Sequence, residues 1–80
     1  MKQRILVIDD DELVRTGISA NLAREGFAVR MAEGGEQGLA EIKREAVDLV
    51  LCDLVLGDMD GIDVLRRIKS EWPDIAVVMI

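Results

Sequence analysis

The sequence has no histidine, one cysteine, one proline and no apolar run near the roughly 18 residues that a membrane span needs. Without histidine, and with Cys52 as its one thiol, the chain cannot build the usual zinc sites or an internal disulfide. The apolar run near its N-terminus is too short for a signal peptide. We therefore expect a cytoplasmic protein in which Cys52 is a small buried side chain.

Basic residues are also scarce, with 10 Lys+Arg against 16 Asp+Glu and a formal net charge of -6. This balance argues against direct contact with nucleic acid, because such contact depends on cationic side chains that neutralise phosphates. A hydrophobic content of 50% argues equally against a disordered chain. Eighty residues predict a single domain with a thin core.

Short runs of branched apolar residues recur along the chain and predict buried strands at 4–8, 27–32, 47–52 and 75–80. Between them lie three helical patterns. The first is expected to end at Gly26, and the third to span 61–72 before Pro73. The apolar faces expected for the three helices are, in order, Leu13, Val14, Gly17, Ile18 and Leu22; Leu39, Ile42 and Ala46; and Ile62, Leu65 and Ile68. Alternating strands and helices predict an α/β fold with a parallel sheet and helices on both faces.

Aspartates follow two of the predicted strands. Asp9, Asp10 and Asp11 follow the first, and Asp53 follows the third. Parallel sheets bind ligands at the carboxyl ends of their strands, so these carboxylates meet at one edge if the two strands are neighbours. Clustered carboxylates must share protons or bind a cation, and oxygen ligands favour Mg²⁺ or Mn²⁺. Turn formation or helix capping stays open for each aspartate, and is the interpretation that we favour for Asp11.

Asp53 has a further property, because Gly57 and Gly61 make the segment after it flexible. Its carboxylate would then be open to an incoming phosphorus centre. Carboxylates act as nucleophiles in phosphoryl transfer and form an aspartyl phosphate. The sequence therefore points to phosphoryl chemistry at Asp53.

The stretches ILVIDDDE (5–12) and DLVLCDLVLGDMDG (48–61) together resemble the receiver domain of two-component response regulators. The second stretch follows the family pattern D-x-x-x-P-x-M-D-G from Asp53 onward. The resemblance implies a flavodoxin-like fold and a protein that is not an enzyme. It implies that Asp53 is the phosphoacceptor and that a sensor histidine kinase is the partner. It also implies an Mg²⁺ site made by Asp53, the acidic pair Asp9 and Asp10, and the backbone carbonyl of Val55.

The sequence departs from the family at two places. Gly57 replaces the usual proline, which leaves the segment after Asp53 less restrained. The chain also ends at Ile80, so we expect residues 1–80 to be the N-terminal part of a receiver domain, with strand order 2-1-3-4 and without the fifth strand and the last two helices. The Ser or Thr and the Lys that normally contact the phosphoryl group would be missing, and switching would be impaired. An exposed fourth strand would then favour self-association.

Two other functions remain open on the sequence. One is a non-phosphorylated interaction module or dimerising fragment that keeps the fold without the chemistry. The other is a phosphatase like the haloacid dehalogenases, whose D-x-D arrangement Asp9 and Asp11 would supply.

Overall fold

The computed structural model describes residues 2–80 and contains one parallel sheet with three helices. The elements follow the order β1 (Arg4–Ile8), α1 (Glu12–Arg24), β2 (Ala28–Ala32), α2 (Gly35–Arg44), β3 (Leu49–Cys52), α3 (Gly61–Glu71) and β4 (Ala76–Met79). The strands lie in the order β2-β1-β3-β4, and every pair is parallel. The predicted fold class and strand order are confirmed. The strands after β1 begin one or two residues later than the apolar runs.

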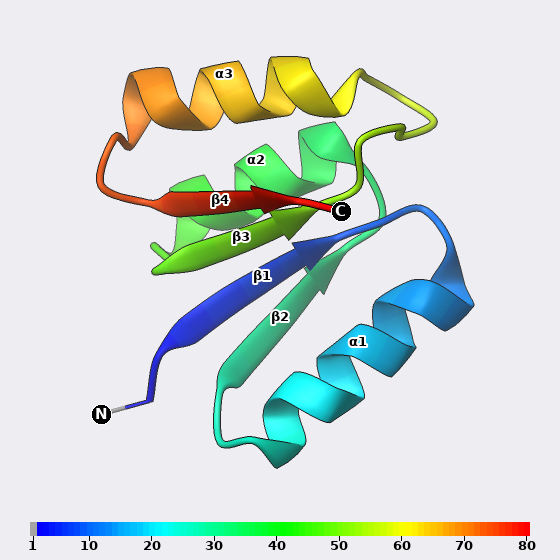
Figure 1. Cartoon of the computed structure of the whole chain (residues 1–80). Coiled ribbons are helices and arrows are strands. Elements are labelled where there is room, and N and C mark those ends of the chain that lie inside the picture. The colour runs from blue at the N-terminus through cyan, green and yellow to red at the C-terminus, as the bar shows by residue number, and fades with distance from the viewer. Residues whose placement is uncertain (1) are drawn as a thin grey trace.

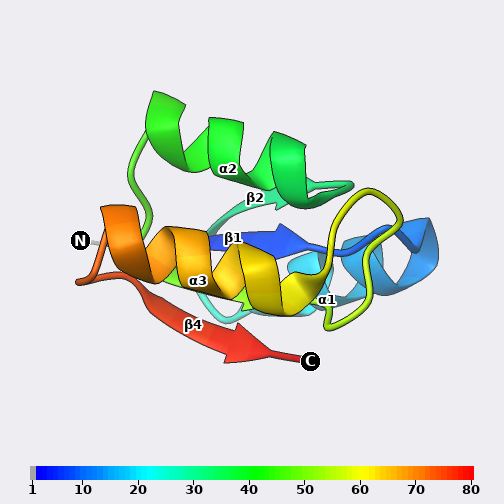
Figure 2. The ribbon, with the colours of Figure 1, turned by 90° about the horizontal axis from the view of Figure 1, so that it is seen from above.

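The helices cover the two faces of the sheet unequally. Figure 1 shows α1 on one face and α2 and α3 on the other, and Figure 2 shows α2 and α3 side by side. The main core lies on the face of α2 and α3, and includes Leu6, Ile8, Leu39, Ile42, Val50, Cys52, Val64 and Ile68. Since side chains alternate along a strand, Ile5 and Val7 face α1. None of the helices among the described residues is long and apolar enough to span a bilayer.

The apolar face expected for the first helix is wrong at Leu13, Val14 and Gly17. The side chains that α1 buries are Arg15 and Ser19, whereas Leu13 is 84% exposed and Val14 is 44% exposed. The physical reason is a buried hydrogen bond of 2.8 Å in which Nη1 of Arg15 donates to the backbone carbonyl of Asp9. This bond fixes the rotation of α1 about its axis. Of the remaining expected residues, Gly17 is exposed, and Ile18 and Leu22 are half-buried.

The other two helical faces are confirmed in part. Leu39, Ile42 and Ile68 are buried, but Ala46 is exposed and lies beyond the end of α2, because the chain turns to extended backbone at Glu45. In α3 the inner positions belong to Val64 and Ile68, while Ile62 and Leu65 are half-buried. Helix α3 ends at Glu71, before Pro73, as expected.

Gly26 ends α1 as the sequence predicts. Its φ of 98° lies in the left-handed region, which glycine adopts at little cost. The N–H groups of Gly26 and Phe27 donate to the carbonyls of Ala23 and Leu22 at 3.1 and 3.2 Å. These two bonds form a Schellman motif, which turns the chain into β2.

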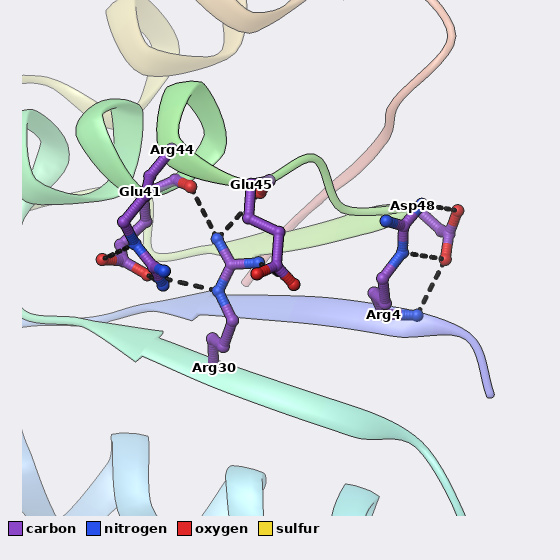
Figure 3. A network of polar contacts seen from close by, with 6 residues as sticks. All are labelled: Arg4, Arg30, Glu41, Arg44, Glu45 and Asp48. Atoms are coloured by element: carbon purple, nitrogen blue, oxygen red, sulfur yellow. Dashed lines mark hydrogen bonds and ion pairs between the residues drawn. The ribbon is translucent and has the colours of Figure 1, made fainter.

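An arginine from β2 closes the carboxyl end of α2 (Figure 3). Nη2 of Arg30 donates to the backbone carbonyls of Glu41 and Glu45 at 2.6 and 2.9 Å, and Nε donates to Oε1 of Glu41 at 3.2 Å. The last carbonyls of a helix lack partners within the helix and carry partial negative charge, so a cation is favourable there. Arg30 thus fixes one end of α2 to the sheet.

A second ion pair joins the starts of β1 and β3. The N–H of Arg4 donates to Oδ2 of Asp48 at 2.8 Å, and the N–H of Asp48 donates to the Arg4 carbonyl at 2.8 Å. Figure 3 shows the Arg4 guanidinium turned toward the same carboxylate. These bonds, first the backbone N–H of Arg4 and then its side chain, hold the pKa of Asp48 below its ordinary value of 3.8.

We expect the Asp48 carboxylate to contribute to the loss of folding stability as the pH falls into the acid range. A group whose pKa is lower in the folded state stabilises the protein above its unfolded pKa, and that contribution is lost as the pH falls through the folded value. The melting temperature of Asp48→Asn should therefore fall less steeply between pH 5 and pH 2 than that of the unsubstituted protein. Asp74→Asn, in the exposed segment before β4, is the control. Equal slopes for Asp48→Asn and the unsubstituted protein would contradict the prediction.

Candidate functional site

The register of β1 and β3 brings the two groups of aspartates together. Ile8 and Cys52 are paired across the two strands, and the N–H of Asp53 donates to the Ile8 carbonyl at 2.9 Å. The N–H of Asp9 donates to the Ala32 carbonyl of β2 at 3.1 Å. Asp9 and Asp53 therefore follow neighbouring strands at the same level, at the edge toward which the arrows point in Figure 1.

Carboxylate oxygens of Asp9, Asp10 and Asp53 all lie within 4.8 Å of one another. Asp9 is buried, Asp53 is half-buried and Asp10 is exposed, so the cluster runs from the interior to the surface. Three like charges at this separation repel, and the cost grows where water is excluded. These three residues were predicted to meet if the two strands are neighbours, and the structure brings them together.

Some of the aspartates near this edge cap helices, and others do not. Oδ1 of Asp11 accepts from the Val14 N–H at 3.1 Å and caps α1, and Oδ1 of Asp60 accepts from the Ile62 N–H at 2.8 Å and caps α3. The capping interpretation of Asp11 is confirmed. Within residues 2–80, the carboxylate of Asp10 makes no hydrogen bond or ion pair. Capping therefore does not account for Asp10.

A buried arginine lies beside the cluster without neutralising it. Arg15 is 8% exposed and donates to the backbone carbonyl of Asp9, not to its carboxylate. Oδ1 of Asp9 instead accepts from the Asp11 N–H at 2.9 Å. None of the ion pairs in the described part of the chain includes a carboxylate of the cluster. This donor set suits a small divalent cation such as Mg²⁺, which favours oxygen ligands and retains water.

Arg15 was not among the residues predicted from sequence, because the expected inner face of this helix was defined by apolar side chains alone. A weak signal existed. Arg15 and Ser19 are four residues apart and share a face, but the hydrogen bond that satisfies the buried Arg15 goes to a carbonyl in the preceding loop.

The segment from Asp53 to Gly61 folds back on itself. Val55 and Asp60 form an isolated antiparallel bridge, and the N–H of Gly61 donates to the Leu54 carbonyl at 3.0 Å. A Cβ atom at Gly61 would collide with the carbonyl oxygens of Asp53 and Leu54, so only glycine permits this closure. We call residues 54–60 the acceptor loop. Val55, the expected source of a carbonyl ligand, lies in it with its N–H 3.4 Å from Oδ1 of Asp53.

Asp58 connects the acceptor loop to α2. Its two carboxylate oxygens accept from the N–H groups of Gly35 and Glu36 at 2.9 and 3.0 Å. These bonds, that from Glu36 first, hold the pKa of Asp58 below its ordinary value. This contact was not predicted from sequence, since Asp58 and its partners are more than twenty residues apart. The one available signal was Gly34, which precedes α2 without a side chain to cap it.

Comparison with known proteins identifies the family of this chain. The family model described as "Response regulator receiver domain" matches residues 5–80. The chain is 41% identical over 75 residues to the transcriptional regulatory protein ZraR of Klebsiella oxytoca, and 37% identical over 82 residues to the response regulator protein VraR of Staphylococcus aureus. These matches cover 94% and 100% of this chain. They cover 17% and 39% of the two relatives, so the chain spans well under half of their length.

Solved structures agree with this result. A CheY-like response regulator receiver domain protein from Methanospirillum hungatei superposes with a TM-score of 0.96 at 33% identity, over 99% of this chain and 63% of that one. NtrX from Brucella abortus superposes with a TM-score of 0.93 at 36% identity, over 99% of this chain and 18% of that one. The chain belongs to the receiver domain family of two-component response regulators. Receiver domains of this family are signalling modules that interact with histidine kinases and bind Mg²⁺ at an acidic cluster.

Cys52, the residue before Asp53, lies beneath the carboxylate cluster, and its Sγ donates to the backbone carbonyl of Asp53 at 3.4 Å. Its side chain is fully buried, and burial raises the pKa of the thiol to about 11, with smaller contributions from the charges of Asp53 and Asp9. It was expected to be a small buried side chain, and this is confirmed.

We predict that the Cys52 thiol reacts with a thiol reagent only when the protein opens. At pH 8 the labelling rate should be at least about a hundredfold lower than in 6 M guanidinium chloride, because a buried neutral thiol is a poor nucleophile. Mass spectrometry of timed samples measures both rates. Labelling of the folded protein at the unfolded rate would contradict the burial of Cys52.

Proposed function

We propose that this chain accepts a phosphoryl group on Asp53 from the phosphohistidine of a sensor histidine kinase, with Mg²⁺ held beside it. The observation that carries the proposal is the meeting of Asp9, Asp10 and Asp53 at the carboxyl ends of β1 and β3. Family membership supports the reaction class, and the unbonded carboxylate of Asp10 supports a cation.

The ligands that we propose are a carboxylate oxygen of Asp53, the carboxylates of Asp10 and Asp9, and the backbone carbonyl of Val55. Asp10 would bind the ion directly, because its carboxylate is exposed and unbonded. Asp9 would act largely through water, since Oδ1 already accepts from the Asp11 N–H. The bound cation would neutralise negative charge that develops on the phosphoryl oxygens.

The residues of the chain have defined parts in the transfer. A carboxylate oxygen of Asp53 forms the new O–P bond as the N–P bond to the kinase imidazole breaks, and the leaving imidazole takes a proton from water. The Val55 N–H, 3.4 Å from Oδ1 of Asp53, orients the attacking carboxylate. Arg15 fixes the backbone of Asp9 and so the position of the acidic pair.

The two alternative functions fit the geometry less well. A phosphatase of the haloacid dehalogenase type would use Asp9 and Asp11, but Asp11 caps α1, and Asp10 takes the third place in the cluster. A purely structural module would have no reason to bring three carboxylates together at the cost of their repulsion. Neither alternative explains Asp10.

Phosphorylation tests the proposal directly. With Mg²⁺ and acetyl phosphate, or a phosphorylated kinase, the protein should gain one phosphoryl group, and Asp53→Asn should gain none. Intact-mass spectrometry measures the gain. Asp11→Asn is the matched control, because asparagine also caps helices and the same charge is removed one residue from the pair. Equal labelling of Asp53→Asn and the unsubstituted protein would refute the assignment.

Metal binding gives an independent readout. Asp10→Asn should weaken Mg²⁺ binding by at least about tenfold, because removing even a group that only orients a ligand typically costs 10- to 100-fold in metal affinity. Isothermal titration at constant ionic strength measures the dissociation constant. Binding that does not depend on Asp10 or Asp53 would favour the structural module.

We also propose that the 80-residue polypeptide self-associates through β4. This strand pairs with β3 on one side, and on the face of α1 its Val78 is 46% exposed. Leu49 and Leu51 on β3 are only half-buried beside it. An apolar edge strand with unpaired backbone groups offers a template for a second copy.

Sedimentation velocity at micromolar concentration should therefore detect a dimer of the 80-residue polypeptide. Val78→Lys should shift the population to monomer, since a charge on an edge strand opposes pairing. Met31→Lys is the matched control, because it places the same charge at a 45%-exposed position on β2, the other edge of the sheet. A folded monomer throughout would refute the proposal.

A further inference from the structure

Helix α2 begins without a cap of its own. Its N-cap residue is Gly34, which has no side chain to accept from the first N–H groups of the helix. Two further glycines lie within the helix, Gly35 and Gly38, and glycine weakens a helix. A Cβ atom at Gly35 would collide with the side chain of Met59, so α2 lies very close to the acceptor loop. The amino end of α2 therefore depends on this loop.

Asp58 provides the missing cap from the acceptor loop. Each of its two oxygens accepts one N–H, from Gly35 at 2.9 Å and from Glu36 at 3.0 Å. A carboxylate at a helix N-terminus also interacts favourably with the helix dipole. A Cβ atom at Gly34 would lie 2.7 Å from Oδ1 of Asp58, so the absence of a side chain there leaves room for the carboxylate.

The acceptor loop has a weak point next to Asp58. Leu56 is buried and Met59 packs against the core, but Gly57 between them has the freedom of glycine at the position where the family usually has proline. A Cβ atom would fit at this position. Among the described glycines, Gly26 alone has positive φ, and a Cβ atom at Gly57 would lie at an ordinary 3.6 Å from Oδ2 of Asp10. In the described chain the N–H of Gly57 donates no hydrogen bond.

We propose that Asp58 is a positioning residue for the phosphoacceptor site: by binding the first N–H groups of α2, it restrains the acceptor loop in place of the family's proline. The proposal rests on the proposed function, which gives roles to Val55, within this loop, and to Asp53, directly before it. A proline ring would restrain the loop alone. The two hydrogen bonds of Asp58 join the loop to α2, so they also couple the loop to this helix. Displacing α2 would loosen the metal site.

Two variants break this contact in different ways. Asp58→Ala removes the acceptors and a charge. Gly34→Ala keeps the charge and places a methyl group 2.7 Å from Oδ1 of Asp58, on an extended backbone that alanine adopts without strain. In both variants we expect faster amide hydrogen exchange at Gly35, Glu36 and Gly61. We also expect the Mg²⁺ dissociation constant to rise about three- to tenfold when it is measured at a temperature well below the melting temperature of each variant.

Gly57→Pro separates positioning from simple stabilisation. In the Asp58→Ala background, proline should restore Mg²⁺ affinity to within about twofold of the original value, because it restrains the loop directly. It should not slow exchange at Gly35 and Glu36, since it offers these N–H groups no acceptor. A role in stability alone would show lowered melting temperatures with unchanged Mg²⁺ affinity.

Glu33→Gln controls for charge, because Glu33 lines the same surface hollow of about 490 Å³ as Asp10 and Asp58. A change in Mg²⁺ affinity for Asp58→Ala no larger than that for Glu33→Gln, or an unchanged affinity for Gly34→Ala, would overturn the proposal. If the unsubstituted protein shows no Asp10-dependent Mg²⁺ binding, the proposed function fails first. In that case amide exchange at Gly61 tests the restraint by itself. Faster exchange in both Asp58→Ala and Gly34→Ala supports the restraint by Asp58, and unchanged exchange refutes it.

Discussion

The register between β1 and β3 is the constraint on which the site depends. The pair Ile8 and Cys52, closed by the bond from the Asp53 N–H to the Ile8 carbonyl, sets both strand ends at one level. Because side chains alternate, a slip of one residue would move Asp53 relative to Asp9 and turn the core residues of β3 to the opposite face. Burial of Val50 and Cys52 therefore holds the carboxylates together, although these carboxylates repel one another. The core provides the free energy that opposes this repulsion.

Helix α2 depends on other elements at both ends. Asp58 meets its first N–H groups and Arg30 meets its last carbonyls, so an anion and a cation from outside the helix match the two ends of its dipole. A helix with Gly35 and Gly38 in ten residues gains little from intrinsic propensity, and packing decides whether it forms. The same glycines let it approach Met59 and Ile8 closely. This explains how a helix with weak local signals is well fixed beside the acidic edge.

Most of the fold could be predicted from sequence, because branched apolar runs and Gly26 act locally and independently of the rest of the chain. The aspartates of the candidate site were also predictable, since each directly follows a strand. Predictions failed where a distant partner decides the outcome. Arg15 is buried on account of the Asp9 carbonyl, which an apolar pattern does not reveal, and the role of Asp58 depends on amides more than twenty residues earlier. Local patterns report burial by apolar side chains, and not burial that a hydrogen bond makes favourable.

The aspartates at this edge divide their work, and the division is itself evidence about the chemistry. Asp11, Asp58 and Asp60 each give a carboxylate to the backbone N–H groups of a different helix, so that all three helices are capped from the same edge. Their charges also add to the negative potential there. A cluster that served structure alone would have its remaining carboxylates bonded in the same way, yet Asp10 is left unbonded within residues 2–80. An edge already crowded with negative charge tolerates such a group best when a cation binds to it, so the proposed metal site is the one role that requires a free carboxylate at Asp10.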